Sequence, residues 1–277
     1  MGHHSFWKTQ SSVRSLFYNG YYGRRPRNKS GQSDDYSIMV IKTKAIVISS
    51  LKYGESDLIV TCFTETVGIK SYMLKNILKT KRRTFSPALF QPLSQLEIVA
   101  NHKDKGNLEY LKEVKNHYFY KSLHTHVLKS SIAVFIAEIL KNSIKEEQAN
   151  PELFEFLSNS FLWIDNSDSF ANFHITFMLN LSSFLGFYPD ITHRNLPFFN
   201  SAEGVFLNHE SDIYTFKGEV VENFKQFLNK NYEESSKIKL SQNQRNQLLE
   251  FLIAYYQLHI SGFQKPRSLS ILVQLFH

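Results

Sequence analysis

Residues 41–64 read IKTKAIVISSLKYGESDLIVTCFT, and this stretch determines which fold we expect for the first half of the chain. Ile and Val, which favour β-strands, are dense in residues 41–51 and again in residues 58–64. The polar sequence KYGESD lies between the two runs and is typical of a turn. The stretch therefore predicts two strands joined by a short turn, the second of them buried on both faces.

Three more strands are expected downstream, at residues 69–75, 94–100 and 108–114. The last two flank residues 102–107, whose sequence HKDKGN carries a glycine late in the loop, as hairpin turns do. A longer excursion, residues 76–92, separates the third strand from the fourth. Five short strands with such an excursion predict a five-stranded OB-fold barrel, which we place at residues 39–118.

After Tyr118 the apolar residues change from strand spacing to helical spacing, and in residues 123–142 they form one wide stripe typical of a buried helix. Further helices are expected at residues 151–163, 169–185, 220–229, 242–260 and 268–276. Helix ends are indicated by Pro151, Gly186 and Ser241. The chain is therefore predicted as α+β, with an all-α helical domain at residues 119–277 that carries an irregular insert at residues 187–218.

Composition and charge narrow the class of protein. The 277 residues include 42% hydrophobic residues, enough for a packed core, but no apolar run long enough to span a bilayer. A single cysteine, Cys62, excludes a disulfide framework and favours a reducing compartment, so we expect a cytoplasmic protein. The net charge is +6 over residues 39–118 and −3 over residues 119–277, which points to an anionic polymer as the partner of the first half.

Residues 1–38 differ from the rest of the chain. They carry a net charge of +4, contain no acidic residue before Asp34, and are rich in Ser, Asn, Gly, Tyr and Arg. No apolar run of the kind found in secretory signals follows their basic residues. Two interpretations stay open: a disordered extension, or an upstream start codon with the true start at Met39.

The strongest local signal is a basic run at residues 75–83, in which no acidic residue occurs. Its cations are Lys75, Lys79, Lys81, Arg82 and Arg83. Such a run needs water or a counter-charge, so it is either a solvated loop or a segment that contacts nucleic-acid phosphates. Because it leaves the third strand of an expected OB barrel, we favour DNA binding.

Other candidate DNA-binding residues flank the same end of the expected barrel. Lys103 and Lys105 lie in the loop between the fourth and fifth strands, a usual contact loop of OB folds. Tyr53 and Tyr72 offer flat rings on which bases stack, with ordinary packing inside the barrel as the alternative for both.

Motifs of the common enzyme classes are missing from the sequence. It contains no P-loop, no G-x-G-x-x-G, no H-E-x-x-H and no G-x-S-x-G. We therefore expect no catalytic residues, no cofactor and no metal, and predict a non-catalytic protein. Two alternatives remain: a metal-dependent nuclease or other DNA-acting enzyme whose residues converge only in three dimensions, or an adaptor whose basic run binds an acidic protein.

Several motifs resemble the recombination mediator family RecO in the order in which that family carries them. These are residues 44–47 (KAIV), 53–60 (YGESDLIV), 63–65 (FTE), Gly68, Lys75 with the basic run, 88–93 (ALFQPL) and 265–268 (KPRS). The resemblance spans residues 41–276 and implies an N-terminal OB barrel, a C-terminal helical domain and the start at Met39.

The resemblance also implies a function in DNA repair and recombination. Members of the family bind single- and double-stranded DNA, anneal complementary strands and assist loading of the RecA recombinase on strands coated by single-strand-binding protein. The implied partners are RecR, sometimes RecF, and the acidic tail of single-strand-binding protein, in the bacterial cytoplasm at the nucleoid. We assign that tail to the helical domain, with Lys121 and Lys129 facing its carboxylates; plain surface charge is their alternative.

Two departures from the family pattern affect the expected site. Many members carry a four-cysteine zinc module after a Gly-Phe-x-Pro stretch, and here residues 186–189 (GFYP) are followed by no cysteine, only His193 and His209. We therefore predict a degenerate, metal-free module in the insert. In addition, residues 76–78 (NIL) replace the glycine-alanine-arginine that often follows the lysine of the third strand, which leaves the conformation of that turn open.

Overall fold

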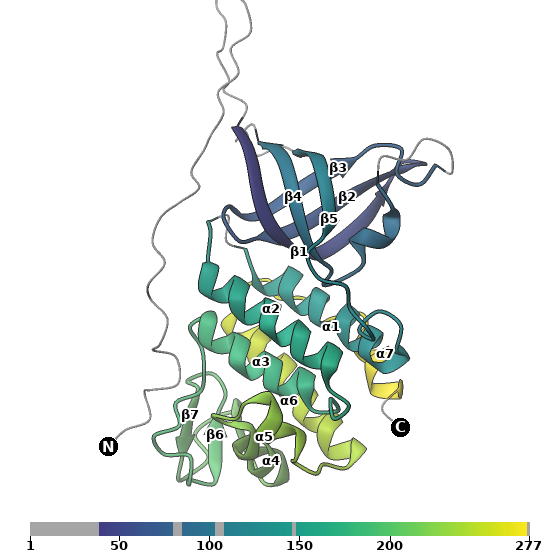
Figure 1. The fold of residues 1–277 in the computed structure, drawn as a ribbon. Coiled ribbons are helices and arrows are strands. Elements are labelled where there is room, and N and C mark those ends of the chain that lie inside the picture. Colours follow the sequence, from purple (N-terminus) through teal and green to yellow (C-terminus); the bar gives the residue numbers. More distant parts are fainter. Residues whose placement is uncertain (1–38, 80–84, 103–107, 146–147, 276–277) are drawn as a thin grey trace, which may run out of the picture.

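The computed structural model describes residues 39–79, 85–102, 108–145 and 148–275. The extension at residues 1–38, with both of its interpretations, lies outside these ranges. The first half forms a five-stranded antiparallel sheet in the order β3-β2-β1-β4-β5 (Figure 1). Its strands are β1 (Met39–Tyr53), β2 (Asp57–Thr64), β3 (Gly68–Leu74), β4 (Gln95–His102) and β5 (Tyr110–Asn116), with a short 3₁₀ helix at Pro87–Phe90 before β4.

The sheet has the strand order of an OB fold, but no continuous ladder among the described residues closes it. In the described residues, the edge strand β3 meets the residue just before β5 through a single parallel bridge between Tyr72 and Glu109. Two backbone hydrogen bonds make this bridge, from Met73 N to Glu109 O and from Glu109 N to Ser71 O, each 2.9 Å long. The predicted barrel is therefore an OB-like, partly open one.

Strand β1 is buried on both faces at residues 45–48. Ala45 and Val47 belong to the interior of the sheet, whereas Ile46 and Ile48 belong to the core of the helical domain, and all four are at most 3% exposed. We predicted two-sided burial for the second strand instead. In β2 it occurs only near the end, at Phe63, because Ile59 and Thr61 are only half-buried.

The second half is a helical domain, as predicted. Its helices are α1 (Val127–Ser143), α2 (Pro151–Asn166), α3 (Phe173–Phe184), α4 (Glu219–Phe227), α5 (Tyr232–Ser236), α6 (Gln242–His259) and α7 (Leu269–Leu275). Pro151 opens α2 behind an Asn150 cap, and Ser241 caps α6 in a capping box with Gln244, so both predicted starts are confirmed. Gly186, with a φ of +83°, follows the end of α3. Within the described ranges we find no helix with the length and apolarity that a membrane span requires.

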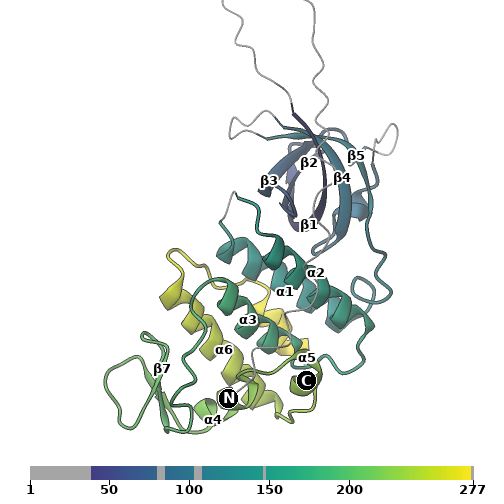
Figure 2. The same ribbon diagram turned by 60° about the vertical axis from the view of Figure 1, so that its left-hand side comes forward.

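The insert is more regular than the sequence suggested. It contains a small antiparallel sheet in the order β7-β6-β8, built from β6 (Phe198–Asn200), β7 (Val205–Leu207) and β8 (Thr215–Lys217). Phe199 is fully buried there, and its ring lies 4.9 Å from the rings of Phe206 and Phe224. This sheet lies at the end of the helical domain away from the β1–β5 sheet (Figures 1 and 2).

The two halves share one continuous junction in which apolar packing is reinforced by hydrogen bonds. Phe63 of β2 packs against Phe154 of α2, with 6.1 Å between ring centroids. Gln95 of β4 is 2% exposed and donates to Ser158 O of α2 at 3.2 Å, while Ser158 Oγ donates back to Gln95 Oε1 at 2.7 Å. Because the amide of Gln95 is buried and satisfied from the helix, the junction fixes the orientation of the sheet on the helices.

The connection into α1 is held by one carboxylate, Asp165, at the end of α2. It is 3% exposed and accepts the backbone N–H groups of Lys121, Ser122 and Leu123 at 2.8–3.0 Å. Burial by itself raises the pKa of a carboxyl, but these hydrogen bonds, with a further one from Ser122 Oγ, outweigh burial and hold the pKa of Asp165 below its usual value.

Replacing Asp165 with alanine is expected to lower the free energy of unfolding by about 3 kcal/mol, because three N–H donors lose their acceptor. The depressed pKa means that the ionised carboxylate stabilises the fold above the pKa of the unfolded chain, about 4, and that this contribution is lost as the pH falls further. Urea unfolding over a pH series measures both effects.

The matched control is Glu155→Ala, because Glu155 is exposed on the same helix. Its free energy of unfolding should stay within about 0.5 kcal/mol of the parent value. Equal losses of stability in the two variants would contradict the role given to Asp165.

Candidate nucleic-acid interface

The first part of the basic run lies at the end of β3, beside the turn between β1 and β2. Asn76 N donates to Asp57 Oδ1 at 2.7 Å, and Leu78 N donates to Ser56 O at 2.9 Å. Both acceptors belong to the end of the β1–β2 turn and the start of β2. These bonds bring the turn, which directly follows Tyr53 of β1, next to Lys75.

Asn76 determines the conformation of the turn after the third strand, where the family often has a glycine. Its φ of +58° lies in the left-handed region, which glycine adopts without strain and asparagine tolerates better than most residues. The bond from its N–H to Asp57 satisfies the backbone at that point. The turn after the third strand therefore keeps a conformation suited to glycine although its sequence differs from the family pattern.

Four lysines around this turn are exposed. Within the described ranges, no Asp or Glu side chain forms an ion pair with any of four exposed lysines, namely Lys52, Lys75, Lys79 and Lys112. Unmatched cations on a surface attract anionic polymers. The other predicted cations, Lys81, Arg82, Arg83, Lys103 and Lys105, lie outside the described residues.

The two predicted stacking tyrosines differ in exposure. Tyr53 is 55% exposed at the end of β1, where its ring is accessible. Tyr72 is fully buried, and its OH lies 3.2 Å from His102 Nε2. Burial raises the pKa of Tyr72. The prediction that Tyr72 stacks on a base is wrong, and its alternative, packing inside the barrel, is confirmed.

A groove lies where β3 and β5 separate. The β3–β5 groove has a volume of about 180 Å³ and is lined by Met73, Leu74, Lys75, Ile77, Phe85, Tyr110 and Leu111. Lys75 Nζ lies 5.7 Å from the centroid of the Tyr110 ring, which is 43% exposed. Sequence reasoning missed Tyr110, Phe85, Lys52 and Lys112. The order Tyr110-Leu111-Lys112 at the start of the fifth strand was the only signal, because alternation places its first and third side chains on one face.

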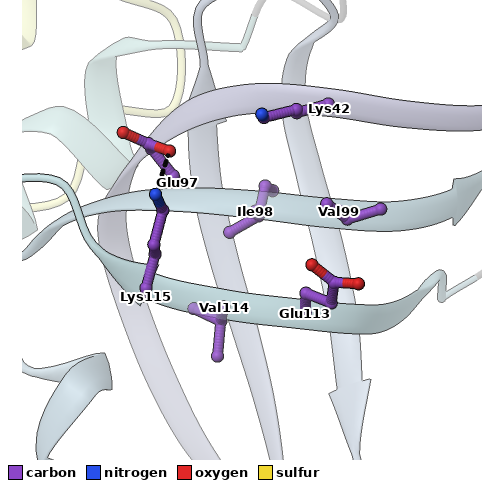
Figure 3. Close-up of a pocket in the computed structure, with 7 residues that line it drawn as sticks. All are labelled: Lys42, Glu97, Ile98, Val99, Glu113, Val114 and Lys115. Carbon is purple, nitrogen blue, oxygen red and sulfur yellow. Dashed lines mark ion pairs between the residues drawn. The ribbon is translucent and has the colours of Figure 1, made fainter.

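A second hollow, with a volume of about 350 Å³, lies on the outward face of β1, β4 and β5 (Figure 3). Its charges are mixed, since Lys42 and Lys115 stand beside Glu97 and Glu113. Lys115 Nζ lies 2.9 Å from Glu97 Oε2, and hydrogen bonds from Lys115 and His117 lower the pKa of Glu97. Because two carboxylates balance its two lysines, and Lys115 is already paired with Glu97, this hollow is a weaker candidate for an anionic polymer than the end of β3.

The two lysines predicted to meet a partner's acidic tail also differ. Lys121 is exposed, and its Nζ donates to Asn166 Oδ1 at 2.9 Å. Lys129 is 4% exposed, and its Nζ donates to Ser122 Oγ at 2.8 Å and to Asp165 O at 2.9 Å. The prediction that Lys129 presents its charge to a partner is wrong, because this charge is used inside the Asp165 junction.

The insert does not fit a zinc centre. His209 Nδ1 lies 2.5 Å from the neighbouring Asn208 Oδ1, and no cysteine occurs in residues 187–218. In the described part of the chain, no three His, Cys, Asp or Glu side chains gather closely enough to hold a metal ion. Aromatic packing around Phe199 stabilises the small sheet at this place.

The chain combines an OB-like sheet with a helical domain that shares a core with it. At one end of the sheet, exposed lysines form no ion pair with a described carboxylate. These features define a class of two-domain α+β protein. Residues 39–120 match the family model for the N-terminal domain of recombination protein O, and residues 124–269 match that for its C-terminal domain. The chain belongs to the RecO family of DNA repair proteins.

Similar proteins cover the same part of the chain. The DNA repair protein RecO of Christiangramia forsetii is 48% identical over 238 residues, and that of Flavobacterium psychrophilum is 44% identical over 238 residues. The DNA repair protein RecO of Phocaeicola vulgatus is 34% identical over 241 residues. Each comparison covers 86% of this chain and 100% of the relative.

The left-handed conformation of Asn76 gives a testable prediction. Asn76→Ala is expected to lower the free energy of unfolding by about 1 kcal/mol, because alanine is strained at positive φ. Asn76→Gly should leave it within about 0.5 kcal/mol, because glycine is free to adopt this conformation. Urea unfolding of the two variants measures the difference, and a loss in the glycine variant as large as in the alanine variant would contradict the explanation.

Proposed function

We propose that the chain is a non-catalytic mediator of recombinational DNA repair whose β1–β5 sheet binds single- and double-stranded DNA. One observation carries this proposal: Lys52, Lys75, Lys79 and Lys112 are exposed around one end of the sheet, and none forms an ion pair within the described ranges. The names of the relatives support a place in DNA repair.

Binding through such lysines is mainly electrostatic. Each phosphate neutralised by a lysine releases condensed counterions, so the affinity falls steeply with salt. The net charge of +6 over residues 39–118 adds a long-range attraction that does not depend on sequence. The sheet therefore holds DNA by its backbone and tolerates any base sequence.

Annealing follows from the same charge. Two complementary strands repel each other because both are polyanions, and a basic surface that contacts both lowers this repulsion. We propose that the chain anneals complementary strands in this way, and that it assists loading of the RecA recombinase on strands coated by single-strand-binding protein.

Protein partners are assigned to the helical domain, since its net charge of −3 makes it a poor DNA surface. We propose contacts with RecR, with RecF, and with the acidic tail of single-strand-binding protein, in the bacterial cytoplasm at the nucleoid. Of the two lysines considered for that tail, only Lys121 is exposed.

A double variant, Lys75→Ala with Lys79→Ala, tests the DNA-binding surface. We expect weaker binding to single strands and duplex alike, and a slope of log affinity against log salt that is smaller by roughly 2, about one unit for each lost phosphate contact. Fluorescence anisotropy over a salt series measures the slope, and a strand-annealing assay should show a slower rate.

The matched control is Lys217→Ala with Lys237→Ala, which removes the same charge from two lysines of the helical domain that already pair with Glu210 and Glu233. This control should keep the parent salt slope. If the parent and the test variant had the same salt slope, Lys75 and Lys79 at the end of β3 would not contact DNA phosphates. Magnesium-dependent strand cleavage would favour the nuclease alternative, and no DNA binding at low salt would favour the adaptor.

A further inference from the structure

We propose that the β3–β5 groove holds one unpaired nucleobase stacked on Tyr110, with Lys75 on the adjoining phosphate, so that it selects single-stranded over double-stranded DNA. This inference rests on the proposed function, because it assigns a strand preference to part of the same surface. In this proposal the aromatic rings of the groove, Tyr110 and Phe85, contact a base, which the lysines, as phosphate ligands, do not.

The groove lies where the two edge strands separate, since in the described residues one bridge alone joins them. The bridge between Tyr72 and Glu109 holds β3 and β5 together, and beyond it no further pairing of the two strands is found in the described residues. The pleat sends Tyr72 and Leu74 inward and Met73 and Lys75 outward. An opening therefore forms with an apolar floor and a cation at its rim.

The size of the groove suits a single ring system. Its volume of about 180 Å³ lies below the roughly 300–1,000 Å³ of pockets that enclose a whole small molecule. The floor is formed by Leu74, Ile77 and Leu111, with Met73 and Phe85 beside them. The apolar floor suits the flat face of a planar ring, while the hydrogen-bonding edge of the ring stays at the open side of the groove.

Tyr110 lacks the packing that explains the other tyrosines of the sheet. Tyr72 is enclosed and hydrogen-bonded, whereas Tyr110 is 43% exposed, and its one aromatic or cationic contact in the described part of the chain is with Lys75 Nζ. An ammonium at 5.7 Å from an exposed ring is held weakly. A phosphate therefore draws Lys75 away readily and leaves the ring face to a base.

We assign the groove to a nucleobase because its surroundings are basic. The lysines favour an anionic chain, and the groove then receives a base of that chain. Lys75 lines it, and the exposed Lys112 follows Tyr110 by two residues along β5; neither pairs with a carboxylate within the described ranges. In a duplex the bases are stacked and paired, so their faces do not reach such a groove. A single strand presents both its base faces and its phosphates.

The affinities for single-stranded and for duplex DNA should therefore respond differently to loss of the Tyr110 ring. Contacts from lysines to phosphates serve single strands and duplex alike, whereas stacking on Tyr110 serves single strands only. Removing the ring should weaken single-strand binding while leaving the salt slope unchanged, because no charge is lost.

The test uses the full chain with Tyr110→Leu, measured by anisotropy with a labelled oligodeoxythymidine and with a duplex of the same length. We expect roughly tenfold weaker single-strand binding, the usual size of one lost stacking contact, and duplex binding within about twofold. Tyr110→Phe keeps the ring and should bind both as the parent does. Tyr214→Leu, which removes a tyrosine of similar exposure, 41%, from the helical domain, is the matched control.

The outcomes separate the two proposals. A parent protein that binds neither DNA overturns the proposed function itself. If the parent binds both, then equal losses for single strand and duplex, or a phenylalanine variant as weak as the leucine variant, overturn the stacking site alone. Unchanged binding in Tyr110→Leu would also overturn it and would leave the groove to an apolar side chain of a protein partner. Urea unfolding of Tyr110→Leu confirms that the fold is intact.

Discussion

The two-sided burial of β1 at residues 45–48 is the constraint on which the rest of the structure depends. Ala45 and Val47 fill the interior of the sheet, and Ile46 and Ile48 enter the core of the helical domain. A strand whose side chains alternate between two cores exchanges them completely if its register slips by one residue. The same four residues therefore fix the pairing with β2 and β4 and seat the sheet on the helices.

Most of the fold was predictable because its signals are local. The turn at residues 52–57, the cap at Ser241 and the proline that opens α2 are each read from a few neighbouring residues. Two-sided burial is not local, since Ile46 and Val47 look equivalent until the helices that cover one of them are placed. Strand β6 was missed for a related reason: three residues are too short to show a period, and the strand exists because Phe199 packs on a helix far along the chain.

The candidate site divides in the same way. Exposure of Lys75 and Lys79 was predictable because a dense run of like charges needs water. Tyr72 and Lys129 were assigned wrongly because the exposure of one residue depends on partners that sequence spacing does not reveal. The ring of Tyr72 shares the inward face with Leu74, and the ammonium of Lys129 meets Asp165 O. Tyr110 lies beside Lys75 only because β5 lies next to β3, a pairing that sequence spacing does not reveal.

The tie between Asp57 and Asn76 makes this end of the sheet a prepared surface. It holds the β1–β2 turn against the residue after Lys75, so Tyr53 and Lys75 are positioned by backbone that is already bonded. The bridge at Tyr72 positions the first residues of β5 in turn. Ordering a flexible loop costs binding free energy, and a surface carried on paired strands avoids most of this cost. An open sheet edge, which in other proteins invites aggregation, is here flanked by lysines that resist pairing with another strand and leave it accessible to a polyanion.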